Sequence, residues 1–130
     1  MVYASEHLAL AASEKFVQLP KPLPPGLDLV QFRLHFGSLP VARIEPSSLP
    51  SDWRHEPVPP ATMQMGDAWV NAGATAILAV PSVLYPEETN FVLNPRHPDF
   101  AKILVSPPEP FSFDPRMSRR HDAGQPPRET

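Results

Sequence analysis

An α+β domain is predicted by three features of this sequence. Proline makes up 20 of the 130 residues, and because proline breaks helices and removes donors from sheets, long regular elements must be few. Residues 8–19 and 61–71 predict helices, the first apolar on most faces and the second amphipathic. Residues 29–36 alternate apolar and polar side chains, which is the period of a half-buried strand. This mixture indicates one domain with long, proline-stiffened connections.

The first half of the chain is expected to begin with a strand over residues 1–4. A helix follows directly, with Ser5 as its N-cap, Glu6 at its positive end and Pro20 as its stop. Because this helix is apolar on most faces, we expect it to be packed inside the domain. Two strands and a turn are expected next, over residues 29–36, 41–44 and 47–53.

The second half is expected to hold the amphipathic helix and three short strands. The helix starts after Pro60 and ends at Gly73, a residue type that readily adopts the left-handed conformation of a helix C-terminus. The strands are expected over residues 74–80, 91–93 and 102–105. Periodicity is lost near the C-terminus, so residues 1–115 are expected to form the domain and residues 116–130 a disordered tail.

The composition excludes several classes of function. The chain has no cysteine, which excludes disulfides, thiolate nucleophiles and cysteine-based zinc sites. Its formal net charge is −3, which does not suit a protein that binds a phosphate backbone, so no direct nucleic-acid partner is expected. No apolar run approaches the length that crosses a bilayer, and no secretory signal begins the chain. A cytoplasmic protein without a membrane partner is therefore expected.

Motifs for metals and cofactors are also missing from the sequence. The five histidines are scattered and no H-E-x-x-H occurs, so no metal site is expected. None of the five glycines belongs to a glycine-rich phosphate loop, which excludes classical dinucleotide-binding and P-loop folds.

Glu14 is the first candidate for chemistry. The predicted helix places it on one stripe with Leu10 and Val17. A carboxylate among apolar neighbours is costly unless it is paired or used in a site. The alternative is that Glu14 lies near the helix end and its carboxylate reaches water.

Ser82 is the second candidate, because it follows Pro81 at the end of a strand that is expected to be buried. A strand end can hold a hydroxyl rigidly at the mouth of a pocket. The alternative is an ordinary turn serine. His97 and Asp99 are close enough in sequence to suggest a hydrolytic triad, but the chain has no G-x-S-x-G elbow.

Residues 87–99 are dense in side chains that bind sugars and phosphates. Asn90 and Asn94 offer both donors and acceptors, and Arg96 offers a planar fork for phosphate. The two residue–proline pairs of this segment, which begin at Asn94 and His97, also fit plain turns.

Three separated motifs and the C-terminal end resemble those of the RES-domain family, and together they cover roughly residues 1–116. Val2-Tyr-Ala-Ser5, followed by Leu8-Ala-Leu-Ala and Glu14, resembles the family's opening helix motif. Met65-Gly-Asp-Ala-Trp-Val70 is similar to its Leu-Gly-Asp-x-Trp-Leu helix. Residues 80–98, from Val80-Pro-Ser82 to Asn94-Pro-x-His97-Pro, resemble its longest motif, and the ending Pro107-Pro-Glu-Pro-Phe-Ser-Phe-Asp-Pro-Arg116 also fits.

This resemblance implies both a fold and an activity. The fold would resemble that of ADP-ribosyltransferases, with a small split β-sheet and packed helices around an NAD-binding cleft. The activity would be that of a toxin that destroys NAD⁺ as a phosphorylase or a glycohydrolase, with NAD⁺ as substrate, inorganic phosphate as an optional co-substrate and no bound cofactor. By motif position, Glu14 and Ser82 would be catalytic, and Tyr3 would be the residue of the substrate pocket. Asn90 and Asn94, chosen for their amide donors and acceptors, would bind substrate with Tyr3.

The resemblance also implies partners. The expected partner is an Xre-like antitoxin, whose helical part would bind DNA, and the toxin would form a homodimer within that complex. An Arg of the family precedes the Val-Tyr strand, whereas this sequence starts at Met1, so the segment with that Arg is expected to be missing. Nothing in the sequence shows that Arg33, Arg43 or Arg96 replaces it. The alternative to an active enzyme is therefore a catalytically inactive RES module that only binds the antitoxin.

Overall fold

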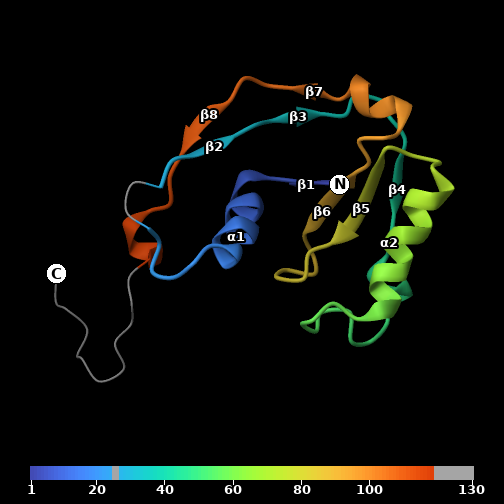
Figure 1. Ribbon diagram of the computed structural model, residues 1–130, viewed down its shortest axis with the longest axis horizontal. Helices are drawn as coiled ribbons and strands as arrows, with labels where there is room; N and C mark the ends of the chain where they lie inside the picture. Colours follow the sequence, from blue (N-terminus) through green and yellow to red (C-terminus); the bar gives the residue numbers. More distant parts are fainter. Residues whose placement is uncertain (25–26, 119–130) are drawn as a thin grey trace.

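A four-stranded sheet in the order β1-β6-β5-β4 forms the centre of the computed structural model, which describes residues 1–24 and 27–118 (Figure 1). Strand β6 pairs antiparallel with both β1 and β5, and β5 pairs parallel with β4. Strands β1 and β4 are therefore the two edges of the sheet. The strands are β1 (Val2–Ser5), β4 (Val41–Arg43), β5 (Ile77–Pro81) and β6 (Thr89–Leu93).

Two antiparallel ribbons lie beside this sheet. Strand β2 (Leu29–Gln31) pairs with β8 (Glu109–Phe111), and β3 (Leu34–His35) pairs with β7 (Leu104–Val105). In Figure 1 the ribbons follow one another along the top of the picture, above β1 and the first helix. The α+β fold class is confirmed by this arrangement.

Residues 29–36 do not form the single strand that their alternation predicts. They divide at Phe32 and Arg33 into β2 and β3. The opposite segment between β7 and β8 contains Pro107 and Pro108, and proline has no N–H to donate to a ladder. The missed strand β8 contains a further proline, Pro110, which explains why the sequence pattern did not indicate it.

The two α-helices lie close to their predicted ranges. Helix α2 (Pro60–Ala72) ends at Gly73, which has φ 62° and donates its N–H to the carbonyl of Trp69 at 3.2 Å. This confirms the predicted C-terminal stop. Three short 3₁₀ helices complete the described elements: η1 (Pro46–Ser48), η2 (Pro98–Lys102) and η3 (Pro115–Ser118).

Helix α1 (Leu8–Gln18) differs from its prediction in its cap. The N-cap is His7, whose Nδ1 accepts the N–H of Leu10 at 3.2 Å. The prediction of Ser5 as N-cap is wrong because Ser5 still belongs to β1 and its hydroxyl bonds to Asn90.

The burial of α1 also differs from its prediction. Leu10 is the buried residue of this helix, whereas the side chains of Leu8 and Val17 are exposed. The expectation that α1 is packed inside the domain is therefore wrong. The part of the helix that carries Leu10 and Glu14 faces the sheet, whereas Leu8 and Val17 remain at the surface.

The core lies where β5 and β6 meet the segment that leads into β7. Its buried members are Ala76, Ile77, Leu93 and Ile103. Partly buried side chains pack against them, among which Phe36 and Phe91 meet edge to face with ring centroids 5.1 Å apart. This core holds the start of β5 at Ile77, and Ser82 follows the other end of the strand, after Pro81.

Two further expectations concern the C-terminal tail and a membrane-spanning helix. Most of the expected tail, residues 119–130, lies outside the described residues, while residues 116–118 belong to η3. Within the described residues, no helix has the length and apolar character that crossing a membrane requires.

Candidate functional site

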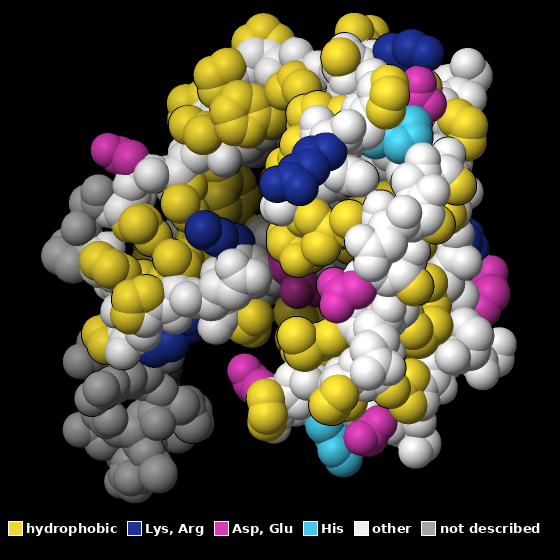
Figure 2. Space-filling model, turned by 45° about the vertical axis from the view of Figure 1, so that its right-hand side comes forward, with side chains coloured by type: hydrophobic (Ala, Val, Ile, Leu, Met, Phe, Trp, Pro, Cys, Tyr) yellow, Lys and Arg dark blue, Asp and Glu magenta, His cyan; other side chains and the backbone are white. Residues whose placement is uncertain are grey.

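A cleft of about 1090 Å³ opens between β1, α1 and the strands β2 and β3. Its lining is largely apolar, and it also contains Tyr3, Ser5 and the two cations Lys15 and Arg33. Figure 2 shows a hollow near the middle of one face, with an acidic group deep in it and hydrophobic side chains around its rim. Glu14, Ser82 and Asn90 do not line the cleft, so the two predicted catalytic residues and one predicted substrate-binding residue lie outside it.

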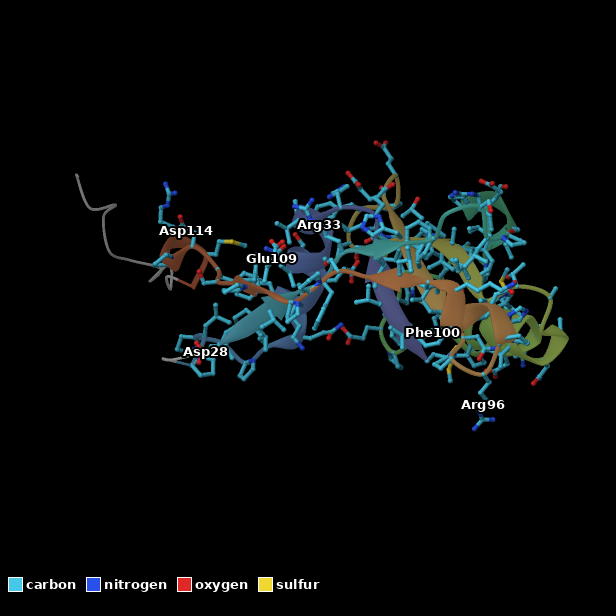
Figure 3. The ribbon with its side chains drawn as sticks, turned by 90° about the horizontal axis from the view of Figure 1, so that it is seen from above. Asp28, Arg33, Arg96, Phe100, Glu109 and Asp114 are labelled. Carbon is cyan, nitrogen blue, oxygen red and sulfur yellow. The ribbon has the colours of Figure 1, made fainter. Side chains whose placement is uncertain are left out.

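The internal arginines occupy different surroundings. Arg33 lies on the ribbon at the cleft, whereas Arg96 points away from the rest of the molecule (Figure 3). Arg43 is exposed on β4. Arg33 is therefore the only one of these three arginines that lines the cleft.

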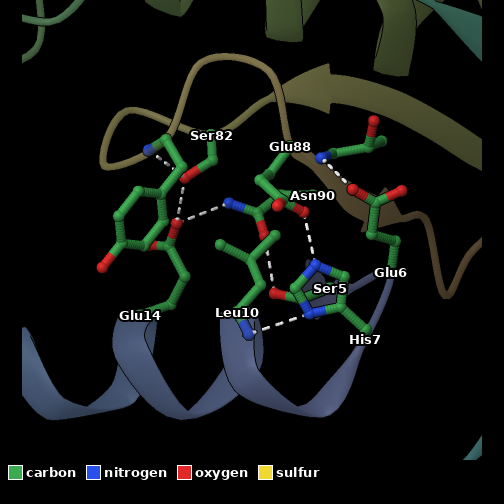
Figure 4. Close-up of polar contacts among 10 residues, drawn as sticks. Ser5, Glu6, His7, Leu10, Glu14, Ser82, Glu88 and Asn90 are labelled. Carbon is green, nitrogen blue, oxygen red and sulfur yellow. Dashed lines mark hydrogen bonds and ion pairs between the residues drawn. The ribbon is translucent and has the colours of Figure 1, made fainter.

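Glu14 is the centre of a polar cluster that joins α1 to the sheet (Figure 4). The hydroxyl of Ser82 donates to Glu14 Oε1 at 2.7 Å, and Asn90 Nδ2 donates to the same oxygen at 2.8 Å. Ser5 Oγ donates to Asn90 Oδ1 at 2.6 Å. Three of the five predicted site residues, Glu14, Ser82 and Asn90, are thus in direct contact.

The local fold explains why Glu14 faces this cluster. Residues four apart share one face of a helix, and Leu10 is buried against the sheet with a relative exposure of 1%. Glu14 lies one turn further along the same stripe and is half-buried. Of the two readings of Glu14, the structure therefore shows the partnered carboxylate and not one that reaches only water.

Ser82 is fully buried, and its hydroxyl is saturated with hydrogen bonds. It follows β5, and its Oγ accepts the backbone N–H groups of Leu84 at 3.1 Å and Tyr85 at 3.2 Å. Its one proton is donated to Glu14. A hydroxyl held in this way is suited to orienting a carboxylate and poorly suited to nucleophilic attack.

The triad alternative is not supported by the contacts of His97. Its Nδ1 accepts the N–H of Asp99 at 3.0 Å and caps η2. The hydrogen bonds described for the Ser82 hydroxyl join it to Glu14, Leu84 and Tyr85, and none joins it to His97 or Asp99.

The remaining two predicted residues, Tyr3 and Asn94, lie apart from the cluster. Tyr3 is 73% exposed and lines the cleft from β1. Asn94 follows the opposite end of β6 from Asn90, is buried, and accepts the N–H of Arg96 at 3.0 Å. Asn94 is thus engaged in a turn, which is the alternative that the sequence had left open.

Glu6, His7 and Glu88 form the group of described residues that could hold a metal ion. His7 Nδ1 accepts from Leu10, so the proton of the neutral ring is on Nε2, which contacts Glu88. That hydrogen bond from His7 is the largest cause that holds the pKa of Glu88 below its usual value. A metal on Nε2 would have to displace this proton while Nδ1 kept its role as a cap. The geometry therefore favours a helix cap.

Sequence reasoning missed two contributors to the site. Ser5 was assigned to a cap, and its contact with Asn90 depends on the pairing of β1 with β6, which places these residues opposite one another. Arg54 donates to backbone carbonyls beside Ser82 from a distant loop. No local pattern marks either contact.

Comparison with known proteins gives consistent matches over almost the whole chain. A family model described as RES domain matches residues 1–114. The Prs ADP-ribosylating toxin of Sphingobium sp. (strain YBL2) is 38% identical over 122 residues, which cover 92% of this chain and 76% of that toxin. Toxin Res of Yersinia enterocolitica is 32% identical over 117 residues, covering 89% of this chain and 76% of the toxin. Toxin Res of Pseudomonas putida is 30% identical over 122 residues, which cover 90% of this chain and 79% of that toxin.

Proposed function

The chain belongs to the RES domain family, and from this membership and the geometry around Glu14 we propose that it is a toxin that cleaves the nicotinamide–ribose bond of NAD⁺. The observation that carries the proposal is the pair of hydrogen bonds on Glu14 Oε1. Both partners donate to the same oxygen, which suits an ionised carboxylate. Oε2 accepts no hydrogen bond from the described residues, so it is free to face a substrate.

The proposed reaction places a positive charge where a carboxylate can stabilise it. Cleavage of a glycosidic bond passes through an oxocarbenium-like state. Glu14 Oε2 would stabilise that charge, orient the ribose hydroxyls or accept the proton of an attacking water or phosphate. Water yields nicotinamide, ADP-ribose and a proton, whereas phosphate yields nicotinamide and phosphorylated ADP-ribose. Ser82 and Asn90 would hold the carboxylate in its reactive orientation before the substrate arrives.

The cleft offers groups that suit the rest of this substrate. In the proposed complex, the exposed ring of Tyr3 stacks on one of the aromatic bases. Lys15 and Arg33 supply positive charge for the pyrophosphate. Ser5 links the two regions, since it lines the cleft and also donates to Asn90. Asn94 would shape the turn after β6 and not contact the substrate.

The product of the reaction identifies the acceptor of the ADP-ribose group. The name of the Sphingobium relative describes ADP-ribosylation, in which the same bond breaks and ADP-ribose is transferred to another molecule. Free ADP-ribose, its phosphate and a labelled protein are three different products of one bond cleavage. Isotope-labelled NAD⁺ followed by mass analysis distinguishes them.

We also propose a protein partner for this chain. A protein that degrades NAD⁺ would harm the cell that makes it unless another protein blocked its site. The family resemblance names that protein as an Xre-like antitoxin and favours a toxin homodimer within the complex. Co-expression with a neighbouring antitoxin gene, followed by light scattering of the purified complex, tests both the partner and the stoichiometry.

The experiment that tests the activity measures nicotinamide release from NAD⁺, with and without phosphate. We expect release by the wild type and a loss of about 10²–10⁴-fold in Glu14→Gln, the range for a positioned acid–base group. The glutamine keeps an oxygen that can accept from Ser82 and Asn90, so the fold should survive. Glu109→Gln, an exposed change on β8, is the matched control.

Two results would contradict the proposal. One is a Glu14→Gln protein that retains the wild-type rate. The other is a wild type that shows a cooperative thermal transition and releases no nicotinamide, because this would favour a module that only binds its partner.

A further inference from the structure

Arg54 binds the backbone that immediately follows Ser82. This arginine lies in the loop between η1 and α2. Its Nε donates to the carbonyl of Val83 at 2.7 Å, and its Nη2 donates to the carbonyl of Leu84 at 3.4 Å. Among the described residues, Arg54 forms no ion pair with a carboxylate, so its charge is directed at these two carbonyls.

The same two peptide groups bind Ser82 through their N–H ends. The carbonyl of Val83 shares a peptide group with the N–H of Leu84, and the carbonyl of Leu84 shares one with the N–H of Tyr85. Both N–H groups donate to Ser82 Oγ, at 3.1 and 3.2 Å. Ser82 in turn donates to Glu14 Oε1 at 2.7 Å. A continuous chain of hydrogen bonds therefore runs from the Arg54 guanidinium to the Glu14 carboxylate.

Each link in this chain strengthens the next. A cation that binds a peptide carbonyl polarises the peptide group and makes its N–H a stronger donor. Two such N–H groups on one hydroxyl oxygen make its O–H a stronger donor as well. The contacts also fix the geometry of the turn. Arg54 binds the carbonyls of its two peptide groups, and the Ser82 hydroxyl binds their N–H groups.

We propose that Arg54 is a positioning residue for the reaction: it holds and polarises the turn after Ser82, and Ser82 thereby keeps Glu14 in its reactive orientation. This inference rests on the proposed function, because the reaction is the one assigned to Glu14. The hold of Arg54 on the turn does not depend on that function and can be measured without substrate.

The first measurement is amide hydrogen exchange by NMR in the ligand-free protein. In Arg54→Met, the N–H groups of Leu84 and Tyr85 should exchange at least about tenfold faster, the change expected from losing one charge-assisted hydrogen bond. Arg43→Met is the matched control, because Arg43 is exposed on β4 and its side chain makes no described hydrogen bond or ion pair. It should leave both amides unchanged.

The second measurement separates kcat from KM in the nicotinamide assay. In Arg54→Met, kcat should fall by about tenfold or more with KM unchanged, since Arg54 touches the turn and not the substrate. Arg54→Lys should keep part of the wild-type kcat, because it keeps the charge and loses the fork. Added guanidinium should raise kcat in Arg54→Met and should not raise it in Glu14→Gln.

Several outcomes would overturn the inference. Unchanged exchange at Leu84 and Tyr85 in Arg54→Met would show that Arg54 does not hold the turn. Faster exchange with an unchanged kcat would show that the turn does not position Glu14. A wild type that releases no nicotinamide would refute the proposed function, and the exchange data would still decide whether Arg54 holds Ser82.

Discussion

Ser5 and Glu14 bind opposite ends of one side chain, the amide of Asn90. Ser5 Oγ donates to Asn90 Oδ1 at 2.6 Å, and Asn90 Nδ2 donates to Glu14 Oε1 at 2.8 Å. A carboxylate only accepts hydrogen bonds, so the amide nitrogen must face Glu14. This arrangement joins β1, β6 and α1 at one point and makes the direction of each hydrogen bond testable.

Replacing Asn90 with aspartate reverses the polarity of its contact with Glu14. Asn90→Asp would place a second carboxylate at hydrogen-bond distance from Glu14, and two like charges at that distance repel. At neutral pH, nicotinamide release should fall further than in Asn90→Ala, which only removes a donor. At lower pH, Asn90→Asp should recover in part, because one shared proton restores the hydrogen bond. Rates measured across pH for both variants check this prediction, and a wild-type rate for Asn90→Asp at neutral pH would contradict it.

Removing the hydroxyl of Ser82 should destabilise the fold as well as lower activity. In Ser82→Ala, the N–H groups of Leu84 and Tyr85 lose their acceptor. We expect the free energy of unfolding to fall by about 1–3 kcal/mol, the cost of buried donors left unsatisfied. Urea unfolding measures this change, with Ser112→Ala at an exposed position as the control. An unchanged midpoint would show that water replaces the hydroxyl.

Short sequence patterns predicted the elements whose ends are marked by neighbouring residues, such as α2. Helix α2 and its stop at Gly73 follow from a proline start, an amphipathic period and a glycine end. The environment of α1 could not be predicted in the same way. When most faces of a helix are apolar, the sequence pattern does not indicate which face packs against another element. The cap at His7 was missed since serine is the more usual cap and Ser5 was available in sequence.

The candidate site was predicted as a set of residues and not as a geometry. Motif positions indicated Glu14 and Ser82, the amide chemistry of residues 87–99 indicated Asn90, and the structure places these side chains in contact. Glu14 and Ser82 are 68 positions apart in the chain, so their contact depends on how α1 packs beside the sheet. The contribution of Ser5 depends on the register of β1 and β6, and that of Arg54 depends on how its loop packs. Neither can be predicted from the spacing of residues along the sequence.

The contact between His7 and Glu88 should make a small, pH-dependent contribution to stability. The hydrogen bond from His7 is the largest cause that lowers the pKa of Glu88 from its ordinary value of 4.5. The folded state therefore favours the carboxylate form, and this stabilisation is present above the ordinary pKa and is lost as the pH falls through the lowered one. In Glu88→Gln, the melting temperature should fall less between about pH 6 and about pH 3 than in the wild type. Glu87→Gln, at the adjacent exposed position, should keep the wild-type dependence.

Gly66 within α2 and Gly73 at its C-cap provide a matched test of the helix stop. Gly73 has φ 62°, a conformation that residues with a Cβ adopt at a cost, whereas Gly66 lies within the helix. A Cβ added at either position would meet no atom within 4 Å, so the two changes differ in backbone conformation and not in crowding. Gly73→Ala should lower the free energy of unfolding by about 1–2 kcal/mol.

Gly66→Ala should have the opposite sign. Alanine loses less conformational entropy on entering a helix, so the free energy of unfolding should rise by about 0.5–1 kcal/mol. Urea unfolding of the two variants side by side measures both changes. If Gly66→Ala also destabilised the protein, the prediction would be contradicted, because the added methyl group would then have to clash with atoms that the structure does not place near Gly66. If Gly73→Ala were neutral, α2 would have to end by another route than the left-handed residue, and the start of the segment that leads to β5 and Ser82 would shift with it.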